Sequence, residues 1–361
     1  MIYQYKILDT VEEDPYMNSL SIIFIVATYP ATYGHTSVIN NLCQGLTKLG
    51  HRTAIGAFTF KKDPPKDVEK VQLSRFELLR SGVKSLDYDI IHPHQAQVLY
   101  FLLAKKPDKP VIVHYHAASN MIQKLNLKFS MALFKNKISK FISVSKKASN
   151  HLKEWAGECD DIVVYNGVDT KFFNPNLDGP YRKGEPQLLF VSVLRKYKKT
   201  IELVDAIPEL SKKYPKVHLQ IVGNGEEFET LNDIIKQKGL EERVEMTGRI
   251  DDDELKLRYA SSDLYISAST NEHCPVPTFE AMACGKPLVL SELESHNEII
   301  AASKAGLTFS FSDVKDLCQK VEQVYENRIE YSNGAKNFIV NHSLEEFCKR
   351  VEEIYNKVLN Q

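Results

Sequence analysis

The chain has 361 residues, of which 43% are apolar and 26% charged, as in an ordinary globular protein of about two domains. Its net charge of −1 gives no reason to expect nucleic acid as a partner. The six cysteines form no CxxC pair, so zinc and redox motifs are not indicated, and a reduced, cytoplasmic setting is expected.

Residues 1–19 are predicted to be an N-terminal extension, because they are polar and acidic. Met17 within this stretch is an alternative start. No basic segment precedes a long apolar core, so a signal peptide is not indicated. The longest apolar run near the start, 20–27, is far too short to cross a bilayer.

Residues 20–178 are predicted to form a first Rossmann-like domain, which would hold the acceptor. Short apolar runs rich in β-branched residues alternate there with longer amphipathic runs, such as a helix over 36–49. Uncharged strands separated by helices are typical of a parallel sheet that is covered on both faces. The predicted strands are 21–27, 53–58, 89–92, 111–115 and 140–144.

The alternation restarts after a linker rich in Pro, Gly and charge at 174–186, and residues 187–340 are predicted to form a second domain. The predicted strands are 188–193, 217–222, 244–247, 264–267, 287–290 and 306–309. A C-terminal helix is assigned to 341–361, for which a crossing back to the first domain is considered. Two doubly wound domains in tandem would enclose a cleft at the carboxyl ends of their strands, where ligands bind in such folds.

The string NEHCPVPTFEAMACGKPLVL, at 271–290, contains two glutamates with seven residues between them, Glu272 and Glu280. Pro277 favours a helix start, so Glu280 is predicted in the first turn and Glu272 in the preceding loop. A helix start can bind a diphosphate, and a carboxylate there can accept hydrogen bonds from two ribose hydroxyls. Stabilisation of the helix alone is the competing interpretation.

The run LRKYKK, at 194–199, places several cations directly after a predicted strand. A departing diphosphate must meet positive charge, either a metal or fixed cations. The acidic run at 251–253 is interpreted as a solvated helix cap, so no metal site is predicted. GNGEE at 223–227 is too short for a dinucleotide fingerprint, and no GxSxG elbow of a hydrolase occurs. His92 and His94 flank a strand end and are assigned to core packing.

Together with EAMACGKP, several strings in order make the chain resemble glycosyltransferase family 4, the retaining GT-B enzymes. In the first half these are YDIIHPHQ, VIVHYH and FISVSKKA. At the junction and beyond they are VVYNGVDTKFF, QIVGNGEEFETL, VEMTGRI and NEII. The resemblance implies transfer of a sugar from a UDP- or GDP-sugar to a hydroxyl of a glycan or glycolipid, with retention and without a metal or other cofactor.

The resemblance also implies roles for single residues. Glu272 would contact the transferred sugar, Lys198 the diphosphate, and His116 the sugar and acceptor, and these three form the expected catalytic set. The expected donor-binding set is Glu280 on the ribose, Gly34 near the diphosphate, Arg249 and Ile250 beside the base, and Arg195, Pro275 and Val276.

The sequence departs from the family pattern at several of these places. Val193 stands where the family has an arginine, so Arg195 or Lys196 is expected to supply the second cation. Pro275 donates no N–H where glycines are common. His35 follows Gly34 where a second glycine is usual, and residues 295–296 replace a glycine pair. A noncatalytic GT-B binding module, and an epimerase or phosphorylase of similar build, therefore remain as alternatives.

Segment 121–147 of the first domain interleaves lysines with apolar residues and contains no acidic residue. A basic amphipathic helix of this kind can lie on an anionic membrane surface. Peripheral association with the inner membrane face is therefore a hypothesis, and an ordinary helix with lysines in water is the alternative.

Overall fold

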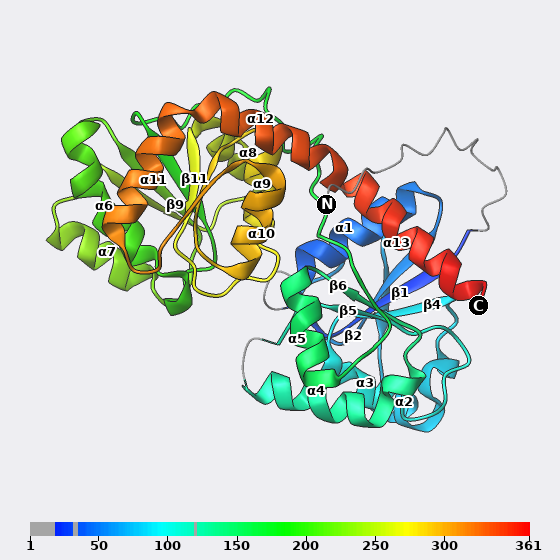
Figure 1. Ribbon diagram of the computed structural model, residues 1–361. Coiled ribbons are helices and arrows are strands. Elements are labelled where there is room, and N and C mark those ends of the chain that lie inside the picture. The colour runs from blue at the N-terminus through cyan, green and yellow to red at the C-terminus, as the bar shows by residue number, and fades with distance from the viewer. Residues whose placement is uncertain (1–18, 32–34, 119–120) are drawn as a thin grey trace.

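The structure is a computed structural model that describes residues 19–31, 35–118 and 121–361. Its first half builds a parallel sheet in two parts, with strand orders β3-β2-β1-β4 and β5-β6-β7 (Figure 1). A parallel bridge between Ile91 and Val111 joins the two parts. The strands are β1 (Ser21–Tyr29), β2 (Arg52–Phe60), β3 (Glu69–Gln72), β4 (Ile90–Pro93), β5 (Ile112–Tyr115), β6 (Lys140–Ser143) and β7 (Asp161–Val163).

Helices connect these strands and cover the first sheet, as parallel pairing requires. Strand β1 is buried along most of its length because its sequence is almost wholly apolar. The helices are α1 (His35–Lys48), α2 (Arg75–Ser81), α3 (Leu99–Leu102), α4 (Met121–Phe134) and α5 (Lys146–Ala156).

The second half forms a six-stranded parallel sheet of order β10-β9-β8-β11-β12-β13. Its strands are β8 (Gln187–Val191), β9 (His218–Val222), β10 (Val244–Gly248), β11 (Leu264–Ser267), β12 (Leu288–Ser291) and β13 (Gly306–Phe309). Its helices are α6 (Thr200–Lys213), α7 (Phe228–Gln237), α8 (Asp252–Ser261), α9 (Val276–Ala283), α10 (Glu294–Ser303), α11 (Val314–Glu326) and α12 (Arg328–Ile339). The predicted α/β class with two Rossmann-like domains is confirmed.

Two strands that the sequence did not predict lie at edges of the first sheet. Strand β3 reads EKVQ and β7 reads DIV, so neither carries the long apolar run that marks a buried strand. An edge strand pairs on one side and can stay exposed, which removes the need for such a run. Among the predicted strands, most bounds differ from the observed ones by only one or two residues.

The last helix, α13 (Leu344–Leu359), leaves the second domain and packs on α1 of the first (Figure 1). Its Tyr355 hydroxyl lies 2.5 Å from Nδ1 of His92, and Glu352 forms a buried 2.7 Å pair with His51. The two chain segments that pass between domains also pair, since the Leu344 N–H donates to the Val168 carbonyl at 2.7 Å. The C-terminal helix therefore completes the core of the first domain.

Candidate active site

A cleft of about 480 Å³ lies between the two domains. The first domain lines it with residues that follow β4 and β5, and the second with the loops that follow β8 and β11. These are the carboxyl ends of parallel strands, where the peptide groups leave their ladders and side chains can converge on a ligand. The cleft therefore lies where the sequence predicted it.

Lys198 and Glu272 form an ion pair in the wall of this cleft. Lys198 ends a short 3-10 turn after β8, and Glu272 lies in the loop between β11 and α9. Their side chains are 13% and 14% exposed. Burial by itself would raise the pKa of the Glu272 carboxyl, but the charge and hydrogen bond of Lys198 outweigh it and hold that pKa below its ordinary value. Glu272 is therefore ionised at neutral pH.

The backbone of Glu272 is held from both domains. Nζ of Lys147, on α5, donates to the Glu272 carbonyl at 2.9 Å, and the Ser295 hydroxyl on α10 donates to the same oxygen at 2.9 Å. Nearby, Asn150 donates to Glu294 at 3.2 Å, so α5 and α10 form a polar contact across the cleft. From the sequence alone, Lys147 is expected on a basic surface that faces either solvent or lipid. The structure places it against the cleft loop instead.

Glu280 lies in the second turn of α9, and the prediction that it lies in the first turn is wrong. The helix begins at Val276 with Pro275 as its N-cap, so Pro277 is the second helical residue and Glu280 the fifth. The Tyr259 hydroxyl donates to the Glu280 carboxyl at 2.8 Å. Burial raises the pKa of Glu280 to about 7, although the Tyr259 hydrogen bond opposes the shift. This carboxyl therefore titrates near neutral pH.

The structure brings part of the predicted set to one cavity. Lys198, Glu272 and His116 line the cleft, as do the donor-set residues Arg195, Pro275 and Val276. Glu280, Arg249 and Ile250 are not among the lining residues. Ile250 packs on the apolar cluster that contains Tyr259 and Phe279, which lie beside Glu280. Gly34 lies outside the described residues.

The structure distinguishes the two candidates for the second cation. Arg195 is partly buried in the cleft wall, whereas Lys196 is exposed and does not line the cleft. Asp251 is the N-cap of α8 and accepts from the Glu254 N–H at 2.8 Å, so the acidic run caps a helix as predicted.

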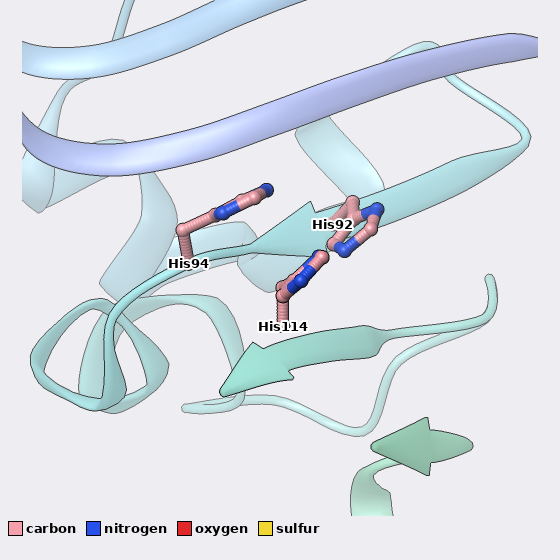
Figure 2. Close-up of side chains that lie close together, drawn as sticks. All are labelled: His92, His94 and His114. Carbon is pink, nitrogen blue, oxygen red and sulfur yellow. The ribbon is translucent and has the colours of Figure 1, made fainter. Parts of the chain in front are cut away.

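His116 follows β5 and lines the cleft together with His35, whose ring stacks on it at 4.2 Å between centroids. Its Nε2 lies 2.9 Å from Nδ1 of His94. Burial, and then the neighbouring histidines, lower the pKa of His116 well below its ordinary value, so the ring is neutral. His92 and His94 are buried, as predicted. Figure 2 shows them beside His114: His92 is on β4, His94 is in the loop that follows β4, and His114 is on β5.

Sequence reasoning missed three groups that contact the predicted residues: Tyr259 on Glu280, and Lys147 and Ser295 on the Glu272 carbonyl. Lys147 and Ser295 occur in strings that were singled out, FISVSKKA and the replaced glycine pair. Tyr259 could not be singled out from the sequence, because a lone tyrosine inside a helix is expected to pack in the core.

Segment 121–147 is not one amphipathic helix. It spans α4, a 3-10 turn, β6 and the start of α5, and its lysines differ in their partners. Nζ of Lys137 donates to the Leu103 carbonyl at 2.8 Å, and Lys140 pairs with Asp160 at 2.5 Å. Helix α4 alone presents an apolar face to solvent, made of Met121, Ile122, Leu125, Phe129 and Leu133. No helix among the described residues has the length and hydropathy to cross a membrane.

Two family models match adjacent parts of the chain. Residues 33–172 match the model described as Glycosyltransferase Family 4, and residues 178–340 match the one described as Glycosyl transferases group 1. The boundary between them falls close to the linker that the sequence predicted.

Curated relatives and a solved structure agree with these matches. The phosphatidyl-myo-inositol mannosyltransferase of Mycolicibacterium smegmatis is 28% identical over 67% of this chain, which spans 63% of that enzyme's length. The alpha-monoglucosyldiacylglycerol synthase of Streptococcus pneumoniae is 25% identical over 92% of this chain and 84% of its own. The structure of Anabaena HepE with UDP and glucose superposes with a TM-score of 0.77 at 17% identity, covering 94% of this chain and all of that one.

Proposed function

The chain belongs to the glycosyl transferases group 1, glycosyltransferase family 4, with the GT-B fold, and on that premise we propose that it transfers a sugar from a nucleoside diphosphate donor to a hydroxyl acceptor with retention of configuration. The observation that carries this proposal is the Lys198–Glu272 pair, set in an interdomain cleft whose other wall presents His116.

The cations of the cleft support departure of the diphosphate without a metal. Lys198 and Arg195 lie on the same loop after β8 and both line the cleft. As the bond between sugar and phosphate breaks, negative charge grows on the leaving oxygen, and fixed cations in a partly dry site stabilise it strongly. Glu280 would hold the donor ribose, farther along α9. Addition of a chelator is expected to leave the transfer rate unchanged.

The acidic character of the cleft supports retention. Among the described residues that line it, Glu272 is the one acidic side chain, and its pKa is depressed by Lys198. A general base for inversion needs a pKa near the working pH and a free lone pair. Glu272 does not meet the first condition, because Lys198 depresses its pKa and occupies one of its two oxygens. We therefore infer that an oxygen of the leaving diphosphate takes the acceptor proton on the same face of the sugar.

The donor can be identified by thermal shift with UDP, GDP and their sugars, followed by transfer assays with the donor that stabilises the protein. Proton NMR of the product then gives its anomeric configuration. An α-linked product from an α-linked donor supports the proposal. An inverted product would contradict retention, and donor binding without transfer or donor hydrolysis would favour the noncatalytic binding module.

We further propose that the acceptor is presented at a lipid surface, against α4. The exposed fractions of Ile122, Phe129 and Leu133 are 74%, 61% and 62%, and these residues recur on one face of the helix. Lys128 is exposed within the same helix. Such a face can enter the headgroup region of an anionic bilayer. The names of two relatives refer to lipids: a mannosyltransferase of phosphatidyl-myo-inositol, and a synthase whose product is alpha-monoglucosyldiacylglycerol.

The double substitution Ile122→Ser with Phe129→Ser is expected to weaken binding to anionic vesicles about tenfold or more. Each side chain would bury apolar area in the bilayer worth about 1.5–3 kcal/mol if fully inserted, and partial insertion gives less. Flotation with phosphatidylglycerol vesicles measures the change. Ile329→Ser is the matched control, because Ile329 is 76% exposed on α12 of the second domain. Equal flotation of the double variant and the control would refute the proposal.

A further inference from the structure

Five histidines of the first domain stack beside the cleft. The neighbouring ring centroids lie 4.2 to 5.3 Å apart, and the planes of each pair are within 26° of parallel. His92, His94 and His114 are almost completely buried, although His94 and His114 line the cleft, as does His116 directly after β5. The histidines of the stack are His35, His92, His94, His114 and His116.

The buried part of this stack invites comparison with a metal site. Ring nitrogens of His92, His94 and His114 lie within 4.8 Å of one another (Figure 2). Their ring planes, however, make angles of only 15° to 24°. A nitrogen lone pair lies in the plane of its own ring, so three nearly parallel rings do not direct three lone pairs at one point. Zinc at about 2.0–2.1 Å from each nitrogen would require these rings to turn. The burial of these rings, which lowers the pKa of each, instead suits neutral imidazoles.

The hydrogen bond between Nδ1 of His94 and Nε2 of His116, 2.9 Å long, orders this stack. Between two neutral rings, one nitrogen must donate and the other accept. If His116 donated, the proton of His94 would sit on its Nε2, which is buried and has no partner among the described residues. A buried N–H without an acceptor is rarer than an unused lone pair. The proton of His94 therefore belongs on Nδ1, where it is donated to His116.

We propose that His94 is a positioning residue that fixes the tautomer of His116, so that His116 carries its proton on Nδ1 and offers an N–H to an oxygen of the bound substrate. The nitrogen that a histidine uses is set by the hydrogen bond its other nitrogen makes. With Nε2 occupied by His94, Nδ1 is the nitrogen left for a ligand. His116 is then a hydrogen-bond donor to a hydroxyl or phosphate oxygen, and it is not a base. The identity of this oxygen rests on the proposed transfer reaction, whereas the tautomer does not.

The tautomer can be read directly by NMR on the full chain labelled with ¹⁵N-histidine, from two-bond proton–nitrogen correlations. The His116 signals are assigned by their loss in His116→Gln. We expect the Nδ1–H form in the wild type, although neutral imidazole in water prefers the Nε2–H form. His94→Leu should return His116 to Nε2–H. His94→Asn should preserve Nδ1–H, because its side-chain amide can donate from near the position of the histidine Nδ1.

An Nε2–H signal for His116 in the wild type would overturn the proposal, whether or not any variant folds. So would an unchanged Nδ1–H signal in a folded His94→Leu protein. The matched control is His114→Leu, which removes a neighbouring ring of the stack that stands 4.7 Å from His116 without the hydrogen bond. The tautomer of His116 should not change in this control.

A comparison of kinetic constants distinguishes a loss of His116 orientation from a general disturbance of the fold. His94→Leu is expected to lower kcat about tenfold, the equivalent of one hydrogen bond, while His94→Asn stays within about threefold of the wild type. Equal losses in both variants, or a loss confined to KM, would show that His94 does not act through His116. If no transfer activity exists at all, the proposed function fails, and the NMR result still decides the tautomer.

Discussion

Replacing Lys198 with alanine is expected to lower kcat about 10²–10³-fold, equivalent to roughly 2.7–4 kcal/mol of transition-state stabilisation. Lys198 faces the cleft from the loop after β8, with its side chain 13% exposed, so its charge is only partly screened by water. Its partner in the free protein is Glu272, and the leaving diphosphate would take over part of that role. Glu272→Ala should cost a similar factor through loss of the sugar contact. Initial rates at saturating donor measure both effects.

Lys196→Ala is the matched control for Lys198→Ala. Both lysines belong to the same 3-10 turn, but Lys196 is exposed and does not line the cleft. The kcat of Lys196→Ala should stay near that of the wild type. The kcat of Arg195→Ala should lie between those of Lys196→Ala and Lys198→Ala. Unfolding temperatures must accompany the rates, because Lys198→Ala leaves a buried carboxylate without its cation. A folded Lys198→Ala protein with activity within about tenfold of wild type, roughly 1.4 kcal/mol, would reject the assignment.

The position of this pair could be predicted from sequence because each residue follows a buried strand. Strands β8 and β11 read QLLFV and LYIS, and they are neighbours in the sheet. The carboxyl ends of adjacent parallel strands meet at one edge, so Lys198 and Glu272 come together although 74 residues separate them. The uninterrupted apolar residues of the two strands, together with the strings that resemble the family, were enough to predict that Lys198 and Glu272 lie near each other.

Contacts across the cleft could not be predicted in the same way. Lys147 reaches the Glu272 carbonyl from the other domain, and Asn150 reaches Glu294. Such contacts depend on how two separate cores are oriented, and they leave no periodic pattern in either segment. Because Lys147 stands in a segment rich in lysine, the sequence indicated only that it lies on a surface that faces solvent or lipid. Which face of α5 meets the second domain depends on how the two segments that connect the domains, and α13, orient the domains.

The start of α9 illustrates a more local failure. Pro277 favours the first turn of a helix, and the sequence therefore suggested a start near Glu280. The helix begins earlier, with Pro275 as N-cap and Val276 as its first residue. Glu280 thus lies one turn inside the helix, against Tyr259, rather than at the amides of the helix start. This change of position gives the carboxyl its buried surroundings and its pKa of about 7.

Glu280→Ala is expected to weaken binding of the donor's nucleoside about 10²-fold or more, because a ribose can make two charge-assisted hydrogen bonds, each worth about 1.5–3 kcal/mol, to this carboxylate. The wild-type affinity should also depend on pH. With a pKa of about 7, Glu280 is mostly protonated at pH 6 and mostly ionised at pH 8. A ligand that needs the ionised form should therefore bind about tenfold more tightly at pH 8. Calorimetry with uridine or guanosine, whichever base the donor panel selects, avoids titration of a phosphate.

Glu280→Gln is the control for this dependence, because it keeps the shape of the side chain and cannot ionise. Its affinity should be weaker and the same at both values of pH. The folding equilibrium should respond in the opposite sense. A carboxyl whose pKa is raised in the folded state stabilises the fold fully below the unfolded pKa, and this contribution is lost as pH rises through about 7. The wild type should therefore lose stability relative to Glu280→Gln between pH 5 and pH 8 while it gains nucleoside affinity. If nucleoside affinity and stability each changed with pH in the same way in the wild type and in Glu280→Gln, the assignment of Glu280 to the ribose would be rejected.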